Sequence, residues 1–171
     1  MKYSTKNIKF RKRNSVSEVE EGLSLAPKFN ENGLIPCITI EKKTKEVLMF
    51  SFLNSLALKK TIITKKAHYF SRSRKKIWLK GEVSGMSQSI SNIFVDDDQD
   101  CIIYEVTLNK PKLKGKPASC HVGYKSCFYR KLKLDQENIA LEFTEKNKIR
   151  TNKKRNKLMV VPSHGLEPRT Y

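Results

Sequence analysis

A run of four aspartates within five residues is the feature that most limits how this chain can fold. The segment 96–100 reads Asp-Asp-Asp-Gln-Asp and lies between two short apolar segments, 93–95 and 101–104, that are typical of strands. Carboxylates gathered in this way repel one another strongly unless a cation neutralises them. The cluster is therefore expected to join or end strands and to project from the edge of a sheet.

The alternation of Asp96, Asp98 and Asp100 adds a second expectation. Alternate side chains on an extended backbone share one face, so these three carboxylates would converge. Carboxylate oxygens are hard ligands that favour Mg2+ or Ca2+. An EF-hand loop begins with similar spacing, but the glycine and the terminal glutamate of that motif do not follow here. A solvated acidic turn is the simpler alternative.

A second cluster of metal-ligand type follows about twenty residues later. Cys120 and Cys127 bracket His121, and thiolate and imidazole ligands favour Zn2+. The spacing is not that of a zinc finger, and two small core residues are the alternative reading. A catalytic zinc site usually has three protein ligands and an open position for water. A third ligand must therefore come from elsewhere in the chain or from a second subunit.

The remaining patterns predict an α+β class that is mostly β, as a single strand-rich domain with one short helix. Asn54 is a suitable N-cap for a helix ending near Thr64. Its expected apolar stripe comprises Leu56, Leu58, Ile62 and Ile63. The expected strands, of which the first two would form a hairpin, are 34–40, 46–52, 67–70, 87–95, 101–108, 128–134 and 139–143.

Charge divides the chain into three parts. The formal net charge is +18, and Lys-rich segments at 2–13 and 146–157 inflate it. We expect a basic, partly disordered leader at 1–30, a folded domain at 31–145 and a disordered basic tail at 146–171. The charge indicates a polyanionic or phosphorylated partner, or only a lysine-rich composition. Nucleic acid is disfavoured, because aromatic residues do not alternate with the basic runs.

No segment of the sequence indicates a membrane or secretory protein. The longest apolar runs are far shorter than the ~20 residues that span a bilayer. The N-terminal segment is polar and lacks the apolar core of a signal peptide. We therefore expect a cytoplasmic protein.

The segment 71–85 combines phosphate-binding side chains with glycines. Arg72 and Arg74 offer planar forks for phosphate, and Lys80 adds positive charge nearby. Gly81 and Gly85 would let the backbone approach a ligand closely. An exposed basic loop is the alternative, in which the single tryptophan of this segment would be a core anchor.

Read in order, these motifs resemble phosphoribosyl-AMP cyclohydrolase, an enzyme of histidine biosynthesis. The resemblance runs from about residue 33 to residue 130, and no single motif in it is specific alone. It rests on Gly33-Leu34-Ile35-Pro36, Glu46-Val47-Leu48-Met49, Ser71-Arg72-Ser73-Arg74, Trp78-Leu79-Lys80-Gly81-Glu82-Val83-Ser84-Gly85, the aspartate cluster, Cys120-His121-Val122-Gly123 and Ser126-Cys127-Phe128-Tyr129-Arg130.

The resemblance implies a hydrolase that opens the adenine ring of phosphoribosyl-AMP at the N1–C6 bond. Many family members carry a fused pyrophosphohydrolase domain, but the segment after Arg130 is short and polar, so we expect the monofunctional form. It implies a homodimer with sites at the interface, Mg2+ on Asp96, Asp98 and Asp100, and Zn2+ on Cys120 and Cys127. In the family a third zinc thiolate usually stands between the first two aspartates, where this chain has Asp97. Asp97 through an oxygen, or Cys101, would then complete the zinc site. A zinc-containing structural or nucleic-acid-binding protein without activity is the alternative.

The resemblance also suggests roles for individual side chains. A proton must reach N1 when the ring opens, and His121 or His68 would supply it. His121 is the better candidate because it adjoins a zinc ligand, although a structural role beside that ligand is equally consistent. The expected substrate-binding residues are Arg72, Arg74, Trp78, Lys80, Glu82 and Ser84.

Overall fold

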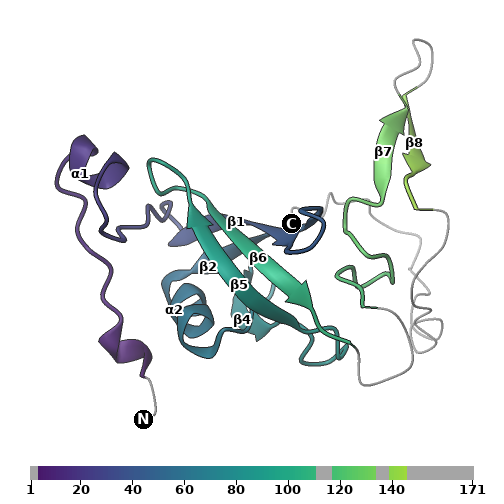
Figure 1. Ribbon diagram of the computed structural model, residues 1–171, viewed down its shortest axis with the longest axis horizontal. Helices are drawn as coiled ribbons and strands as arrows, with labels where there is room; N and C mark the ends of the chain where they lie inside the picture. The colour runs from purple at the N-terminus through teal and green to yellow at the C-terminus, as the bar shows by residue number, and fades with distance from the viewer. Residues whose placement is uncertain (1–3, 111–116, 134–138, 146–171) are drawn as a thin grey trace.

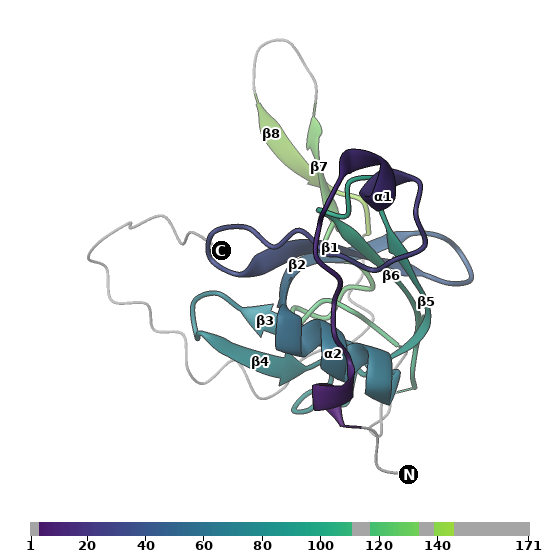
Figure 2. The same cartoon turned by 90° about the vertical axis from the view of Figure 1, so that its left-hand side faces the viewer.

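A computed structural model describes residues 4–110, 117–133 and 139–145 of the chain. The predicted tail at 146–171 and most of the predicted loop at 109–117 lie outside the described residues. A six-stranded sheet, curled around one helix, forms the main body (Figures 1 and 2). The predicted α+β class with mostly strands is confirmed. No helix in the described part is long and apolar enough to cross a membrane.

The sheet has the strand order β4-β3-β2-β1-β6-β5. β1 and β2 form the predicted antiparallel hairpin, whereas β1 and β6 are parallel. All the other pairs are antiparallel. The strand bounds are β1 Leu34–Glu41, β2 Val47–Asn54, β3 His68–Ser71, β4 Lys76–Leu79, β5 Gln88–Val95 and β6 Ile102–Leu108.

Alternation along β1 defines the two faces of the sheet. Ile35, Cys37 and Thr39 are fully buried on the face that carries the core. Ile38 points to the opposite face, where it pairs with Phe50 of β2. Apolar side chains therefore occupy both faces of the central strands, although the described chain covers only one of them.

Helix α2, Ser55–Thr64, covers the core face, and its start and end are as predicted. The side chain of Asn54 accepts a hydrogen bond from the amide of Ala57 at 2.8 Å, which caps the first turn. The predicted apolar stripe is partly wrong, because Leu56 is exposed while Ala57, Leu58 and Thr61 are buried. Successive helical residues are rotated by about 100°, so a face centred on 57, 58 and 61 turns Leu56 outward.

Strand β4 was not predicted, because its lysines made the segment look like a basic loop. A tight turn at 72–75, with Lys75 at φ 47°, lets β4 fold back onto β3. The ring of Trp78 then lies 5.1 Å from the ring of Tyr69 in the core. The interpretation of Trp78 as a core anchor is therefore confirmed.

The described part of the leader contains two short helices that the sequence did not predict. They are η1, Thr5–Asn7, and α1, Val16–Glu20. Phe10 contacts Phe29 at a ring distance of 6.0 Å and packs against the core. The leader thus follows the surface of the main body (Figure 2).

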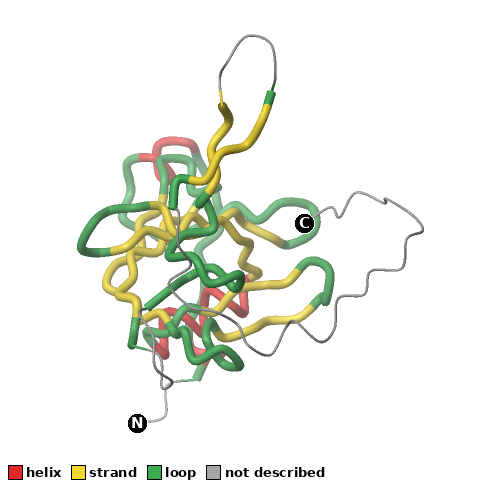
Figure 3. Tube along the Cα trace, turned by 90° about the vertical axis from the view of Figure 1, so that its right-hand side faces the viewer, coloured by secondary structure: helices red, strands yellow, loops and turns green. Residues whose placement is uncertain are grey.

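Strands β7, Arg130–Lys133, and β8, Ala140–Phe143, form the last predicted pair as a separate two-stranded sheet. This hairpin projects from the main body (Figure 3). A hairpin of two strands is marginal alone. The rings of Tyr124, Tyr129 and Phe143 all contact one another, at centroid distances of 4.0–6.1 Å, and attach its base to the segment before it.

Two glycines with positive φ allow a test of this backbone. We expect Gly81→Ala to destabilise the protein by more than about 3 kcal/mol, and Gly33→Ala by only about 1 kcal/mol. Both residues are left-handed, at φ +85° and +69°, but an added Cβ overlaps the backbone of Met86 and Ser87 only at Gly81. Urea unfolding measures both. Equal losses would contradict the close approach at Gly81.

Candidate functional site

The aspartate and cysteine clusters lie at opposite ends of the sheet (Figure 1). The aspartate turn, residues 96–100, joins the end of β5 to the start of β6. The cysteine loop, residues 117–129, is attached to the start of β2. Because β6 is parallel to β1 and β2 is antiparallel to it, these two strands start at opposite ends. Val47 pairs with Ile40, and Ile40 pairs with Glu105, so the two levels are about four residues apart along β6, which is roughly 13 Å.

The aspartates form a closed turn and not the extended row expected from their alternation. The amide of Cys101 donates to Oδ1 of Asp96 at 2.9 Å, and the amide of Gln99 donates to the carbonyl of Asp96 at 3.3 Å. Carboxylate oxygens of Asp96, Asp97 and Asp98 come within 4.8 Å of one another. The turn brings consecutive carboxylates together, so the oxygen donors are grouped differently from the predicted 96/98/100 set.

A lysine of the leader neutralises part of this turn. Nζ of Lys28 lies 2.8 Å from Asp98 and 3.4 Å from Asp100. Its hydrogen bond and charge hold the pKa of Asp98 below the usual range. Lys28 thus takes the position that a cation bound to Asp98 and Asp100 would need.

Gln99 fixes the aspartate turn to the leader, although it lies among charged neighbours. Its side-chain oxygen accepts from the amide of Ala26 at 2.7 Å. Its amide group donates to the carbonyls of Val19 and Ser24 at 3.0 and 3.1 Å. A buried glutamine with three such bonds holds the leader and the turn as one unit.

The thiols of Cys120 and Cys127 lie close enough to hydrogen-bond to each other. Hydrogen bonding from Cys127 lowers the pKa of Cys120 to about 6, and electrostatic interactions with the neighbouring His121 and Lys80 add to this effect. The same hydrogen bond raises the pKa of Cys127. One thiolate is therefore available near neutral pH, as soft metal ligation requires.

Backbone and hydroxyl hydrogen bonds hold both ends of the cysteine loop. The hydroxyl of Ser126 donates to the carbonyl of Val47, and the amide of Cys127 donates to the carbonyl of Leu48, both at 2.7 Å. The amide of Ser119 donates to the carbonyl of Lys125 at 2.8 Å. The two sulfurs are therefore held by the start of β2 and by a closed loop.

Lys80 occupies a different position from the one expected of a surface phosphate ligand. The side chain is buried, and its ammonium donates to the carbonyl of Ser119. The ammonium also lies 5.6 Å from the ring centre of Trp78 and within the electrostatic reach of both cysteines. Burial lowers the pKa of this amine. Lys80 thus contacts the cysteine loop.

Of the other predicted substrate-binding residues, Trp78 lies on β4, and the remaining four are exposed in the turns before and after that strand. The guanidinium of Arg72 lies 4.2 Å from the ring centre of Phe52. Arg74 donates to the hydroxyl of Ser71 through its amide and its Nε, both at 3.3 Å. Glu82 and Ser84 are exposed in the turn after β4.

The two predicted proton-transfer histidines are placed differently. His121 is exposed beside Cys120. His68 is half-buried at the start of β3, with Nδ1 2.8 Å from the carbonyl of Lys66. Burial lowers the pKa of His68, so its ring is neutral at pH 7. A carbonyl can only accept, so Nδ1 carries the proton and Nε2 the lone pair.

The third metal ligand predicted for the thiols does not come from the described part of one chain. In the described ranges, only Asp96, Asp97 and Asp98 bring three ligand atoms of this type within 4.8 Å. Asp97 and Cys101 both belong to the end of the sheet that carries the aspartate turn. A third donor from these two residues would have to arrive from another copy.

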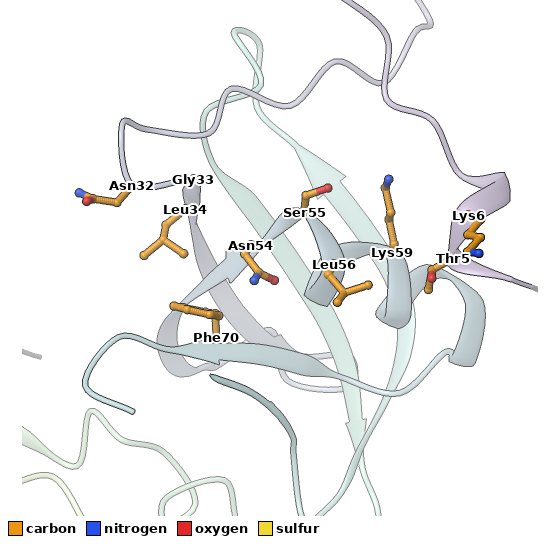
Figure 4. A pocket seen from close by; sticks show the side chains of 10 residues that line it. All are labelled: Thr5, Lys6, Asn32, Gly33, Leu34, Asn54, Ser55, Leu56, Lys59 and Phe70. Carbon is orange, nitrogen blue, oxygen red and sulfur yellow. The ribbon is translucent and has the colours of Figure 1, made fainter. Parts of the chain in front are cut away.

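A pocket of about 530 Å³ lies away from both clusters (Figure 4). It is bounded by η1, the turn at Gly33 and the first turn of α2, with Lys6, Lys59 and Phe70 among its walls. No residue predicted to bind substrate or metal lines this pocket. The pocket therefore does not replace the two clusters as the candidate site.

Comparison with known proteins identifies the family. The family model for phosphoribosyl-AMP cyclohydrolase matches residues 49–129, which include both clusters. A phosphoribosyl-AMP cyclohydrolase of Rhodopseudomonas palustris strain BisB18 is 46% identical over 127 residues, covering 74% of this chain and 82% of the relative. This chain belongs to the phosphoribosyl-AMP cyclohydrolase family.

Two further relatives carry the same name. The phosphoribosyl-AMP cyclohydrolase of Methanoregula boonei is 52% identical over 105 residues, covering 61% of this chain and 80% of the relative. That of Caulobacter vibrioides strain NA1000 / CB15N is 42% identical over 123 residues, covering 72% and 85%. The family resemblance stated from the motifs is confirmed.

Sequence reasoning missed three residues that organise the clusters: Lys28, Gln99 and Gln88. Each is a polar residue whose partners are distant in sequence, at separations of 70, 73 and 31 residues. The only signal for Gln99 was its position inside the acidic run, where a neutral side chain can be buried. Lys28 and Gln88 carried no local signal.

The ion pairs of Lys125 generate a pH-dependent prediction. Nζ of Lys125 lies 2.7 Å from Glu41 and 2.6 Å from Glu46, which ties the cysteine loop to the β1–β2 turn. Burial raises the pKa of Glu41, but hydrogen bonds from Lys125 and Thr44 outweigh it and lower the pKa overall. This stabilisation is complete above the unfolded pKa and is lost as pH falls through the folded pKa.

We therefore expect Lys125→Met to lower the free energy of unfolding by about 1 kcal/mol at pH 7. The difference from the wild type should shrink below about pH 4, where the carboxylates become protonated. Urea unfolding at several pH values measures it. Lys131→Met, which removes a more exposed pair with Glu142, is the control with a smaller effect. A difference that does not vary with pH would contradict the assignment.

Proposed function

We propose that this protein hydrolyses phosphoribosyl-AMP, opening its adenine ring at the N1–C6 bond in the pathway to histidine. Membership of the cyclohydrolase family supports the substrate and the reaction. The observation that carries the proposal is the Cys120–Cys127 pair, because the fold brings two soft sulfur donors of the family match close enough to interact.

The two clusters fit different metal ions. Cys120 and Cys127 would hold Zn2+, which when bound lowers the pKa of a water ligand to ~7 and supplies hydroxide at neutral pH. The oxygen donors of the aspartate turn, Asp96, Asp98 and Asp100 in the family pattern, would hold Mg2+. Consecutive carboxylates at 96–98 already lie within 4.8 Å of one another, so few side-chain movements separate them from a hard-cation site.

The geometry of one chain supports the proposal of a homodimer with sites at its interface. Sulfur and oxygen donors lie at opposite ends of the sheet, so one chain alone does not bring them around one substrate. A two-fold axis makes each surface patch contact its equivalent, and it can place the aspartate turn of one copy beside the cysteine loop of the other. Asp97 or Cys101 would then reach the zinc site from the partner.

The outer face of the sheet suits such an interface. Phe50 of β2 is 50% exposed and Phe94 of β5 is 46% exposed, and Val95 lies beside the aspartate turn. The rings of Phe50 and Phe52 contact each other edge to face at 5.2 Å. An apolar sheet face of this kind is typical of protein–protein contact surfaces.

His121 is the residue that we propose for proton transfer to N1. It adjoins Cys120, so its ring can reach a substrate atom next to the thiol-bound metal. His68 would act from the β3 edge, where its neutral ring presents Nε2 as an acceptor. A His121→Asn variant that keeps full turnover would exclude the role.

The cysteine variants test the function directly. We expect Cys120→Ala and Cys127→Ala each to abolish zinc binding and ring opening, because a single thiol cannot retain the ion. Metal analysis and an absorbance assay with phosphoribosyl-AMP measure both. Cys37→Ala is the matched control, since Cys37 is a buried core thiol on β1. Normal turnover in Cys127→Ala would exclude the proposed zinc site.

A second pair of variants separates the two possible third ligands. If Asp97 binds zinc, Asp97→Asn weakens zinc retention and Cys101→Ser leaves it near the wild-type level. The reverse pattern assigns the ligand to Cys101. Loss in neither variant would show that the zinc ligand comes from another residue.

The ion pairs of Lys28 predict competition with magnesium. We expect Lys28→Met to bind Mg2+ about tenfold more tightly than the wild type, because the ion no longer has to displace an ammonium from Asp98 and Asp100. Calorimetric titration with Mg2+ measures the affinity. Lys42→Met, which removes a lysine at the far end of β1, is the control. Weaker binding in Lys28→Met would contradict the competition.

A further inference from the structure

A line of buried polar side chains crosses the core and ends at the cysteine loop. The hydroxyls of Thr39 and Tyr69 are 2.9 Å apart, and Tyr69 donates to Oε1 of Gln88 at 2.7 Å. Nε2 of Gln88 then donates to the hydroxyl of Ser119 at 3.0 Å. All four residues are at most 1% exposed. Strands β1, β3 and β5 each supply one member.

Stability alone does not require this arrangement. Apolar side chains of the same shape would fill the site at similar or lower free energy, because buried hydrogen bonds gain little over the bonds to water that they replace. Gln88 also lies in an apolar environment, with Nε2 3.8 Å from the sulfur of Met49. The hydrogen bond from Tyr69 fixes the rotamer of Gln88, so that the side-chain amide of Gln88 points toward Ser119.

Lys80 holds Ser119 from a second direction. Its buried ammonium donates to the carbonyl of Ser119, while Gln88 holds the hydroxyl of the same residue. Ser119 directly precedes Cys120. Both bonds therefore act on the residue that sets the position of the first sulfur, and the Lys80 charge also acts on both thiols.

We propose that Gln88 and Lys80 are positioning residues for the binding of a soft divalent cation. Their hydrogen bonds hold Ser119 in place, so that the Cys120 sulfur lies beside that of Cys127 before the cation binds. This inference rests on the proposed function, since it takes the two thiols to be metal ligands. Tyr69 supports Gln88 from the core. Lys80 offsets the negative charge that two thiolates bring to the loop, so its role is electrostatic as well as steric.

The physical benefit is pre-organisation. A loop that must be ordered when the ion arrives loses conformational entropy at that moment and binds more weakly. Groups behind the ligands of metal sites commonly change the affinity by about 10–100-fold when they are removed. A clamp on Ser119 removes the backbone freedom at the position that matters most, one residue before the ligand.

Cobalt and zinc titrations of the full-length protein test the inference. Co2+ bound by thiolates gives an intense near-ultraviolet charge-transfer band, which reports sulfur ligation independently of turnover. We expect Gln88→Leu and Lys80→Met each to bind Zn2+ about 10–100-fold more weakly and to give a weaker Co2+ band. Tyr69→Phe, which removes one hydroxyl, should have a smaller effect in the same direction.

Tyr104→Phe is the matched control. Its ring lies 5.8 Å from that of Tyr69 in the same core and is equally buried, but its hydroxyl does not belong to the line that ends at Ser119. It should alter thermal stability without altering zinc affinity. Mg2+ affinity should be unchanged in all four variants, because the aspartate turn is at the other end of the sheet.

The outcomes separate this inference from the proposed function. A wild type with no thiolate-to-cobalt band overturns the zinc site and the inference together. A wild type that binds zinc, with Gln88→Leu and Lys80→Met equal to Tyr104→Phe, overturns the inference alone. If Gln88→Leu does not fold, Lys80→Met and Tyr69→Phe decide: unchanged zinc affinity in both refutes the clamp.

Discussion

The parallel pairing of β1 with β6 is the constraint on which the arrangement of the chemistry depends. It places the start of β6, and with it the aspartate turn, at the end of the sheet opposite to the start of β2. The cysteine loop is bonded to that second end through Val47 and Leu48. A chain with the same residues and an antiparallel β1–β6 pair would bring both clusters to one end. Strand direction therefore sets the separation of the two clusters within one chain.

A lysine from a distant part of the chain offsets each cluster. Lys28 of the leader contacts Asp98 and Asp100, and Lys80 after β4 lies beside the two thiols. The two lysines differ in burial, and this difference suits different tasks. Lys28 is half-exposed and can move away at small cost, whereas Lys80 is buried and bonded to Ser119, so it stays in place. One acts as an exchangeable counter-ion and the other as a fixed part of the loop.

Much of the framework could be predicted from local patterns. The hairpin of β1 and β2, the Asn54 cap and the strands on both sides of the aspartates all follow from apolar alternation and capping chemistry. The failures have local causes too. The lysines of β4 made that segment look like a basic loop. Leu56 was assigned to the buried face of α2 because it is apolar, although it is exposed. Each leader helix has a local serine cap, but the bonds from Gln99 to Val19 and Ser24 that hold α1 to the aspartate turn lie outside any local window.

The sequence by itself determined the chemistry: hard oxygen donors in one run, soft sulfur donors in another, and the motif order of the cyclohydrolase family. Residue type and spacing along the chain suffice for these, because donor hardness and local geometry are properties of neighbouring residues. Only the tertiary structure decided how far apart the two donor sets lie, which lysine serves each, and that a buried line from Thr39 reaches Ser119. These relations join residues that are 19 or more positions apart, and their geometry depends on strand order and direction, which local sequence patterns do not encode.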